Sequence, residues 1–180
     1  VYKLLLQPNG SLFAATDNGV FRSTNDGETW DAVNSGLMRA KVQSLTSADD
    51  GTLYAGTGSG NIFVSSDNGN NWRLLLSRPR RTISLLALLP LPRPKESSLP
   101  KSVIHDLATF TDGKKQHLVA ATDQGVFQST NGGQNWQSPH TGVSAQEVKK
   151  RGSAWSFATL KGKIPFVGMD AGVYPVEVKQ

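Results

Sequence analysis

Ser23-Thr-Asn-Asp-Gly-Glu-Thr-Trp30 is the first of three copies of an eight-residue stretch, which we call the box. The second copy is Ser65-Ser-Asp-Asn-Gly-Asn-Asn-Trp72, and the third is Ser129-Thr-Asn-Gly-Gly-Gln-Asn-Trp136. Serine, then Asp or Asn, then Gly, then Trp recur at fixed offsets, which indicates an internal repeat. Because a feature that recurs from unit to unit usually builds the unit, the box predicts an architecture rather than an activity.

Two short apolar runs separated by a turn precede each box. They also occur once without a box, at 166–169 and 172–174. The aromatic residues that end the second run are 42, 64 and 47 residues apart, at Phe21, Phe63, Phe127 and Tyr174. Repeats of roughly 40–50 residues are typical of the blades of a β-propeller.

Each unit predicts short strands, most clearly the second unit. There, β-branched and aromatic runs at 42–45, 53–57, 61–65 and 72–75 alternate with Asp-Gly, Gly-Ser and Asn-Gly turns. Such runs between turn residues are hairpin signals. No window has the sustained 3.6-residue apolar period of a helix, so the sequence predicts an all-β chain of four-stranded units.

The predicted domain is one β-propeller of about four blades, at residues 1–40, 41–77, 103–147 and 152–180. Residues 78–102 are an insertion between the second and third blades. The fourth unit has no box and the first begins at its innermost strand, so we expect a partial or incompletely closed ring. Open blade edges favour self-association, or a partner that supplies blades.

Local chemistry explains the box as a structural device. Its Asp or Asn can cap turn amides, and its Gly can adopt the positive φ that tight turns require. Its Trp opens the last strand and supplies a large apolar ring with one N–H to satisfy. The residues interpreted in this way are Ser23, Asn25, Gly27, Trp30, Ser65, Asp67, Gly69, Trp72, Ser129, Asn131, Gly133 and Trp136.

The three boxes resemble the Asp-box, or BNR, motif Ser-x-Asp-x-Gly-x-x-Trp, and the resemblance covers residues 1–77 and 103–180. The motif occurs in propellers of sialidases, family-74 xyloglucanases, sortilin-type receptors and the photosystem II stability/assembly factor group. Two copies carry Asn where the motif has Asp, and Asn caps a turn equally well. The resemblance implies a propeller but selects no function, because one fold hosts many. It favours a secreted, periplasmic or lumenal location, while the sequence itself leaves the compartment unknown.

The insertion at 78–102 accounts for the net charge of the chain. It holds six of the 19 basic residues and one acidic residue, while 13 basic and 13 acidic residues elsewhere cancel. Its five prolines disfavour a long helix or a central strand. Its apolar run at 83–89 is far shorter than the ~20 residues that span a bilayer.

Turns alternate between the two ends of an up-and-down sheet, which predicts that the insertion lies on the face opposite the boxes. Loops on such a face can vary and carry function. We therefore interpret six basic residues as binding residues for a protein with an acidic surface or a membrane-associated complex: Arg78, Arg80, Arg81, Lys149, Lys150 and Arg151. A solvated loop without a role is the alternative. Nucleic acid is not favoured, because aromatic residues do not alternate with these charges.

Catalytic chemistry has little support in the sequence. Asp17, Asp123 and Asp170 lie in equivalent turns on the same face, and a glycosidase needs two carboxylates roughly 5–10 Å apart. Asp is also an ordinary turn residue, so Asp17 and Asp123 are weak catalytic candidates. His105 and the other two histidines lack metal-site spacing, the chain has no Cys, and we interpret the histidines as incidental. The sequence predicts no metal and no cofactor.

The sequence as a whole predicts a non-catalytic binding or assembly propeller that acts through the face opposite the boxes, as the resemblance to the photosystem II assembly factor group implies. The alternative is a fragment of a carbohydrate-active Asp-box propeller, either a glycoside hydrolase or a sugar-binding protein. An enzyme is not favoured. If the chain has an activity, we expect glycoside hydrolysis.

Overall fold

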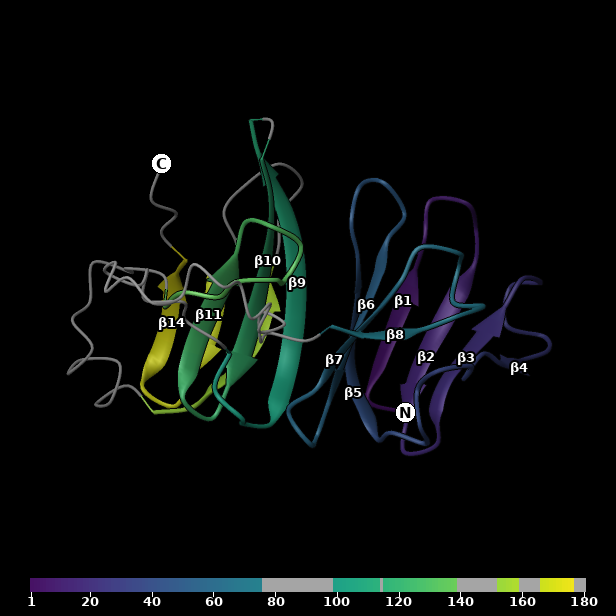
Figure 1. The fold of residues 1–180 in the computed structure, drawn as a ribbon, viewed down its shortest axis with the longest axis horizontal. Helices are drawn as coiled ribbons and strands as arrows, with labels where there is room; N and C mark the ends of the chain where they lie inside the picture. The colour runs from purple at the N-terminus through teal and green to yellow at the C-terminus, as the bar shows by residue number, and fades with distance from the viewer. Residues whose placement is uncertain (76–98, 114, 139–151, 159–165, 177–180) are drawn as a thin grey trace, which may run out of the picture.

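The fold consists of four antiparallel sheets that follow one another along the chain (Figure 1). The computed structural model describes residues 1–75, 99–113, 115–138, 152–158 and 166–176. Within these ranges every regular element is a strand, and none forms a helix long and apolar enough to cross a membrane. The prediction of an all-β propeller architecture is confirmed.

Each sheet is a meander in which every strand pairs with the next one in the chain. We number the sheets as blades 1 to 4. Blade 1 contains β1 (Lys3–Leu6), β2 (Leu12–Thr16), β3 (Gly19–Ser23) and β4 (Asp31–Ala32). Blade 2 contains β5 (Val42–Ser47), β6 (Leu53–Thr57), β7 (Ile62–Ser65) and β8 (Arg73–Leu75). Blade 3 contains β9 (Ile104–Asp112), β10 (Lys115–Thr122) and β11 (Gly125–Ser129), and blade 4 contains β12 (Ala154–Ala158), β13 (Phe166–Met169) and β14 (Gly172–Pro175).

Blade 3 differs from the predicted four-stranded unit. Its first two strands are longer than those of the other blades. Its fourth strand is reduced, in the described residues, to one bridge between Gln128 and Gln137. Those two residues exchange both backbone hydrogen bonds. After the third box, the chain therefore pairs with β11 as a fourth strand would, but at one residue pair only.

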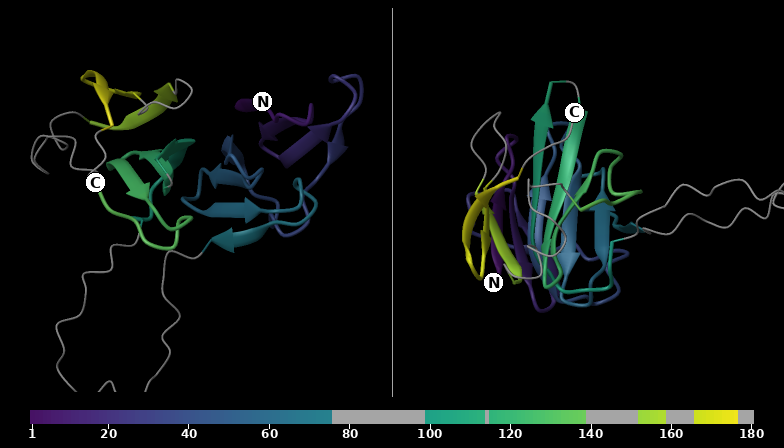
Figure 2. Two further views of the ribbon diagram at one scale, coloured as in Figure 1. Left: turned by 90° about the horizontal axis from the view of Figure 1, so that it is seen from above. Right: turned by 90° about the vertical axis from the view of Figure 1, so that its left-hand side faces the viewer.

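The blades form an arc whose ends are blades 1 and 4 (Figure 2, left). The first strands of successive blades are neighbours, since β1 contacts β5, β5 contacts β9, and β9 contacts β12. Among the described residues, an ion pair also joins two blades that are not neighbours. Lys3 in blade 1 donates to the buried carboxylate of Asp106 in blade 3 at 3.1 Å, and the same carboxylate accepts the backbone N–H of Phe157 in blade 4 at 3.0 Å. Asp106 therefore connects three blades.

The core consists of three apolar layers, each between two adjacent blades. Blades 1 and 2 enclose Phe13, Val20 and Phe63, whereas blades 2 and 3 enclose Tyr54 and Leu118. A third layer lies between blades 3 and 4. Burial of apolar area between sheets is the main source of stability here, because a single sheet of three or four short strands has no second layer of its own.

The box Trp residues belong to these layers. Trp72 packs against blade 1 and donates its indole N–H to the Val33 carbonyl of that blade at 2.9 Å. Trp136 packs in the layer between blades 2 and 3 and donates to the Gly133 carbonyl at 2.8 Å. Trp30 has no preceding blade to cover it among the described residues and is 38% exposed, compared with 5% and 1% for Trp72 and Trp136.

The three boxes share one hydrogen-bond pattern. In the first, Ser23 donates its hydroxyl to Asn25 and accepts the backbone N–H of Gly27, while Asn25 accepts the N–H of Thr29. The second and third boxes repeat these three contacts around Ser65 and Ser129. The box glycine has φ of +91°, +82° and +85° in turn, a conformation that a residue with a Cβ rarely adopts.

The contrast between the box Trp residues gives a stability prediction. Trp72→Ala should lower the free energy of unfolding by about 3–5 kcal/mol, the usual cost of deleting a buried aromatic ring. Trp30→Ala removes the equivalent ring from an exposed position and should cost clearly less. Urea denaturation followed by circular dichroism measures both variants. Equal costs would show that the packing of the Trp on the preceding blade does not matter.

Candidate functional site

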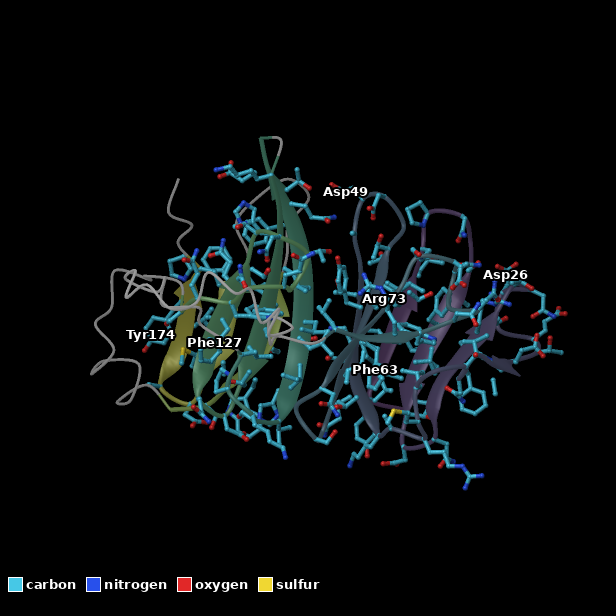
Figure 3. All side chains as sticks on the ribbon, viewed as in Figure 1. Asp26, Asp49, Phe63, Arg73, Phe127 and Tyr174 are labelled. Carbon is cyan, nitrogen blue, oxygen red and sulfur yellow. The ribbon has the colours of Figure 1, made fainter. Side chains whose placement is uncertain are left out.

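The alternation of turns separates two faces of the arc. The boxes share one edge with the loops between the first and second strands, as the labelled side chains of Asp26 and Asp49 show (Figure 3). The turns between the second and third strands lie at the other edge, near the N-terminus in Figure 1. We call these two edges the box face and the turn face. The turn face is made of residues 17–18, 58–60, 123–124 and 170–171.

The turns of the turn face are built alike. In blades 1 and 3 the Thr that ends the second strand accepts an N–H from the turn and donates to the carbonyl of the Gly that follows, as Thr16 does with Gly19. An Asp follows this Thr directly in both blades, and Asp170 occupies the same place in blade 4. Blade 2 has Gly58 instead. The predicted set of Asp17, Asp123 and Asp170 is thus one position in three blades.

Each of these Asp residues binds a ring from the start of the first strand in its own blade. Tyr2 donates its hydroxyl to Asp17 at 2.8 Å. His105 Nε2 lies 2.5 Å from Asp123 Oδ1, and Trp155 donates its indole N–H to Asp170 at 2.5 Å. In blade 2, where the Asp is missing, the Gln43 side-chain carbonyl is buried without a hydrogen-bond partner among the described residues.

Irregular pairing of the first strand explains how three of these side chains reach the turn face. The register between first and second strands shifts at one residue in blades 2, 3 and 4, and the unpaired residues are Gln43, His105 and Trp155. A β-bulge leaves one residue outside the ladder and redirects its side chain. We call the row of Tyr2, Gln43, His105 and Trp155 against the turns the rim. Bulges are frequent next to functional sites, so their recurrence at equivalent positions indicates that the rim is a specific feature of the fold.

His105 and Trp155 join the rims of blades 3 and 4. Their ring centroids are 4.4 Å apart with planes inclined by 45°. Asp123 holds His105 on one side, and Asp170 holds Trp155 on the other while also accepting the Ser153 backbone N–H at 2.8 Å. Trp155 remains 50% exposed, so this group presents a fixed aromatic face to solvent.

A second group lies on blades 1 and 2. The Lys41 ammonium is 4.7 Å from the centre of the Tyr2 ring and 3.5 Å from Asp17, which makes a cation–π contact and a surface ion pair. Both charged side chains are largely exposed. The contacts fix the direction of the Tyr2 ring and contribute little to stability, because water screens them.

The electrostatics of the three Asp residues argue against acid catalysis. The Tyr2 hydroxyl lowers the pKa of Asp17, the His105 side chain lowers the pKa of Asp123, and the Trp155 N–H lowers the pKa of Asp170. A general acid in a glycosidase needs a raised pKa. The catalytic candidates Asp17 and Asp123 are therefore suited to stay ionised and to orient their neighbours.

The predicted basic binding residues cannot be placed. Arg78, Arg80, Arg81, Lys149, Lys150 and Arg151 lie outside the described residues. The last residue of the insertion, however, is described. The Ser102 hydroxyl donates to Asp123 at 3.3 Å, and the backbone of Ser102 lies so close to Gly60 that a Cβ there would be 2.5 Å away. The insertion thus rejoins blade 3 on the turn face.

Sequence reasoning misses the ring partners of the Asp residues. It treats His105 as incidental and does not single out Tyr2, Gln43 or Trp155. Of these residues, only Trp155 could have been noticed in the sequence, since it is the fourth Trp of the chain and the only one outside a box. In the described residues no three His, Asp or Glu side chains gather as a metal site would require.

The first half of the chain matches a known family. Residues 1–90 fit the model of the DUF6242 beta propeller domain. The chain belongs to this family. No curated protein matches this DUF6242 propeller chain in sequence.

Solved structures resemble the DUF6242 propeller in fold. The structure of YCF48 bound to D1 peptide is 21% identical with a TM-score of 0.64, and the match covers 99% of this chain and 50% of that one. An ancestral GH74 enzyme is 17% identical with a TM-score of 0.60, covering 94% and 22%. The extracellular domain of a putative one-component system from B. thetaiotaomicron is 15% identical with a TM-score of 0.65, covering 99% and 21%.

The chain thus spans half or less of the length of each of these structures. At such identities the likeness shows the fold alone. It confirms the predicted resemblance in fold to propellers of both an assembly factor and a glycoside hydrolase, and it does not choose between them.

The second box gives a prediction on pH. The Asn71 backbone N–H, with further donors from Asn71 and Ser65, lowers the pKa of Asp67 to about 2 from its ordinary 3.8. A lowered pKa in the folded state contributes stability above pH ~4 that is lost as the pH falls towards ~2. Asp67→Asn should therefore lose less unfolding free energy between pH 5 and pH 2 than the wild type does.

The first box supplies the matched control. Asn25 occupies the position of Asp67 and makes the same backbone contact, so Asn25→Asp should add acid sensitivity. Urea denaturation at each pH measures both variants. Identical pH profiles for the wild type and both variants would contradict the assignment.

Proposed function

We propose that this chain is a non-catalytic binding propeller that holds a protein partner through its turn face. The observation that carries the proposal is the rim built from the starts of the first strands, where Tyr2, Gln43, His105 and Trp155 lie against the turns of four successive blades. Two of these residues are exposed aromatics, at 44% and 50%. Exposed, orientated Tyr and Trp side chains are typical of interface anchors.

The hydrogen bonding within the box face supports placing the binding site on the turn face. The box Ser, Asp and Asn side chains are engaged in hydrogen bonds within their own turns. Polar groups that already have partners are poorly available to a ligand. On the turn face, by contrast, the Tyr2 and Trp155 side chains are 44% and 50% exposed, so their aromatic rings are accessible to a partner.

The chemistry of the partner follows from the basic residues of the insertion and of 149–151. Six positive side chains favour a partner with an acidic surface, or a complex at a membrane. Among the structural neighbours, YCF48 is bound to D1 peptide, and this chain matches half of its length. That precedent supports a peptide or protein as the ligand class.

Sugar binding or hydrolysis is the second candidate, and one observation favours it. Trp155 offers an exposed aromatic face beside the carboxylates of Asp123 and Asp170, an arrangement that also suits a sugar ring. The likeness to an ancestral GH74 enzyme is consistent with this candidate. The lowered pKa values of Asp17 and Asp123 count against hydrolysis.

Charge reversal tests the binding proposal. Arg80→Glu with Arg81→Glu should weaken capture by an immobilised glutamate-rich peptide about tenfold at low salt, because two surface attractions become repulsions. Surface plasmon resonance measures the affinity. The control is Lys115→Glu, which reverses one charge at the loop on the box face and should leave capture nearly unchanged. Unchanged capture by the double variant would show that Arg80 and Arg81 do not bind the peptide.

Hydrolysis tests the second candidate. Wild-type chain should release no more reducing sugar from xyloglucan than the Asp17→Asn/Asp123→Asn variant does. Both substitutions keep the side-chain carbonyl that accepts from Tyr2 or His105, so the fold should persist. Release by the wild type that the double variant abolishes would establish the enzyme and overturn the binding proposal.

A further inference from the structure

The connection between blades 1 and 2 contains two residues whose backbone conformation is unusual for this chain. Among the described residues, positive φ occurs at glycines and at four other residues. Two of the four are Asp26 and Asn68, with φ of +56° and +57°, and Asp and Asn tolerate this conformation. The other two are consecutive, Met38 with φ of +51° and Arg39 with φ of +52°. Long side chains rarely adopt such angles, so we call Met38 and Arg39 the strained pair.

Contacts on both sides hold the strained pair in place. Leu37, directly before the pair, is fully buried in the layer between blades 1 and 2. Its backbone N–H donates to the Asn34 carbonyl, and its carbonyl accepts the N–H of Ala40, both at 3.0 Å. Gly36 lies so close to the Trp72 carbonyl that no Cβ would fit there. The backbone of the pair is therefore set by its neighbours, which is the condition under which strain persists.

This connection belongs to the turn face. Near its start, the Asn34 side chain donates to the Asn18 carbonyl in the turn of blade 1 at 3.1 Å. At its end, the Lys41 carbonyl accepts the N–H of Gly58 in the turn of blade 2 at 3.2 Å. The blades on both sides of the connection are described, and each blade of such a repeat packs only on its neighbours. Further blades would therefore lie beyond blades 1 and 4 and would leave the connection uncovered.

The side chains of the strained pair gain nothing within the described part of the chain. Met38 is 80% exposed. Arg39 is exposed, and its side chain makes no hydrogen bond or ion pair with a described residue. Asn at either position would adopt the same backbone with less strain. Strain without a local gain is typical of functional sites, where a sequence departs from the local rules that it keeps elsewhere.

We propose that the strained pair is a contact site for an acidic peptide, in which Arg39 binds a carboxylate and Met38 packs on an apolar side chain next to it. This inference rests on the proposed function and specifies the partner sequence that fits. The Arg guanidinium matches a carboxylate with two parallel N–H donors, and Met adapts its shape to apolar partners. Both residue types are enriched in protein interfaces. The fixed backbone lowers the ordering cost of binding.

Charge favours an acidic peptide over a segment of the chain itself. The Lys41 ammonium, 4.7 Å from the centre of the Tyr2 ring, adds a second positive charge to that of Arg39. The apolar run of the insertion at 83–89 directly follows Arg80, Arg81 and Thr82, so its docking here would bring like charges together. A partner with Glu or Asp beside an apolar residue meets no such repulsion.

Two peptides test the proposal, one that alternates Glu with Leu and one that alternates Glu with Ser. Surface plasmon resonance on the full 180-residue chain should show severalfold tighter binding of the Glu–Leu peptide. Met38→Asn should abolish this preference, and Arg39→Asn should weaken the binding of both peptides about fivefold at low salt. Arg73→Asn removes the charge of an exposed residue directly after the second box, so this control should change neither affinity.

Urea denaturation separates a binding role of the strained pair from a structural one. Met38→Asn and Arg39→Asn should unfold at the same or a higher urea concentration than the wild type, because Asn tolerates positive φ. A lower midpoint for Met38→Asn would show that the chain itself covers this side chain, and would overturn the proposal. A Leu preference that survives Met38→Asn, or binding unchanged by Arg39→Asn, would overturn it and leave the proposed function standing. Binding of neither peptide by the wild type would overturn both.

Discussion

The packing of one blade on the next is the interaction on which the structure depends. A meander of three or four short strands buries little apolar surface alone, and the three core layers all lie between blades. Trp72 shows how the box serves this packing, because its ring enters the layer shared with blade 1 while its N–H bonds to the Val33 carbonyl there. Asp106 adds a polar link among blades 1, 3 and 4.

The two faces of the blades differ in their role. The box face supports the packing between blades, and the turn face carries residues that differ from blade to blade. On the box face, the boxes repeat the same hydrogen bonds in three blades. The turn face has Asp at one position in three of the four turns but changes the residue that meets the turn, from Tyr2 to Gln43, His105 and Trp155. Repeat proteins often bind their ligands on extended surfaces to which successive repeats contribute.

The boxes, together with the apolar runs that precede them, allow the four-unit repeat and the separation of the two faces to be predicted, because each depends on local turn chemistry and strand period. The rim cannot be predicted in this way. Asp123 and Asp170 are identified from their turns, but their partners His105 and Trp155 reach them through register shifts, which are not apparent from the turn residues. The reduction of the pairing after the third box to one bridge at Gln137 is likewise not predicted by the repeat.

The central claim is that the turn face binds and the box face supports. The most direct test is to map amide chemical-shift changes in an isotope-labelled chain as a glutamate-rich peptide is added. The account predicts that the changes concentrate in the turns at 17–19, 58–60, 123–125 and 170–172, with the Trp155 indole among the largest. Changes concentrated in the boxes at 23–30, 65–72 and 129–136 would contradict it.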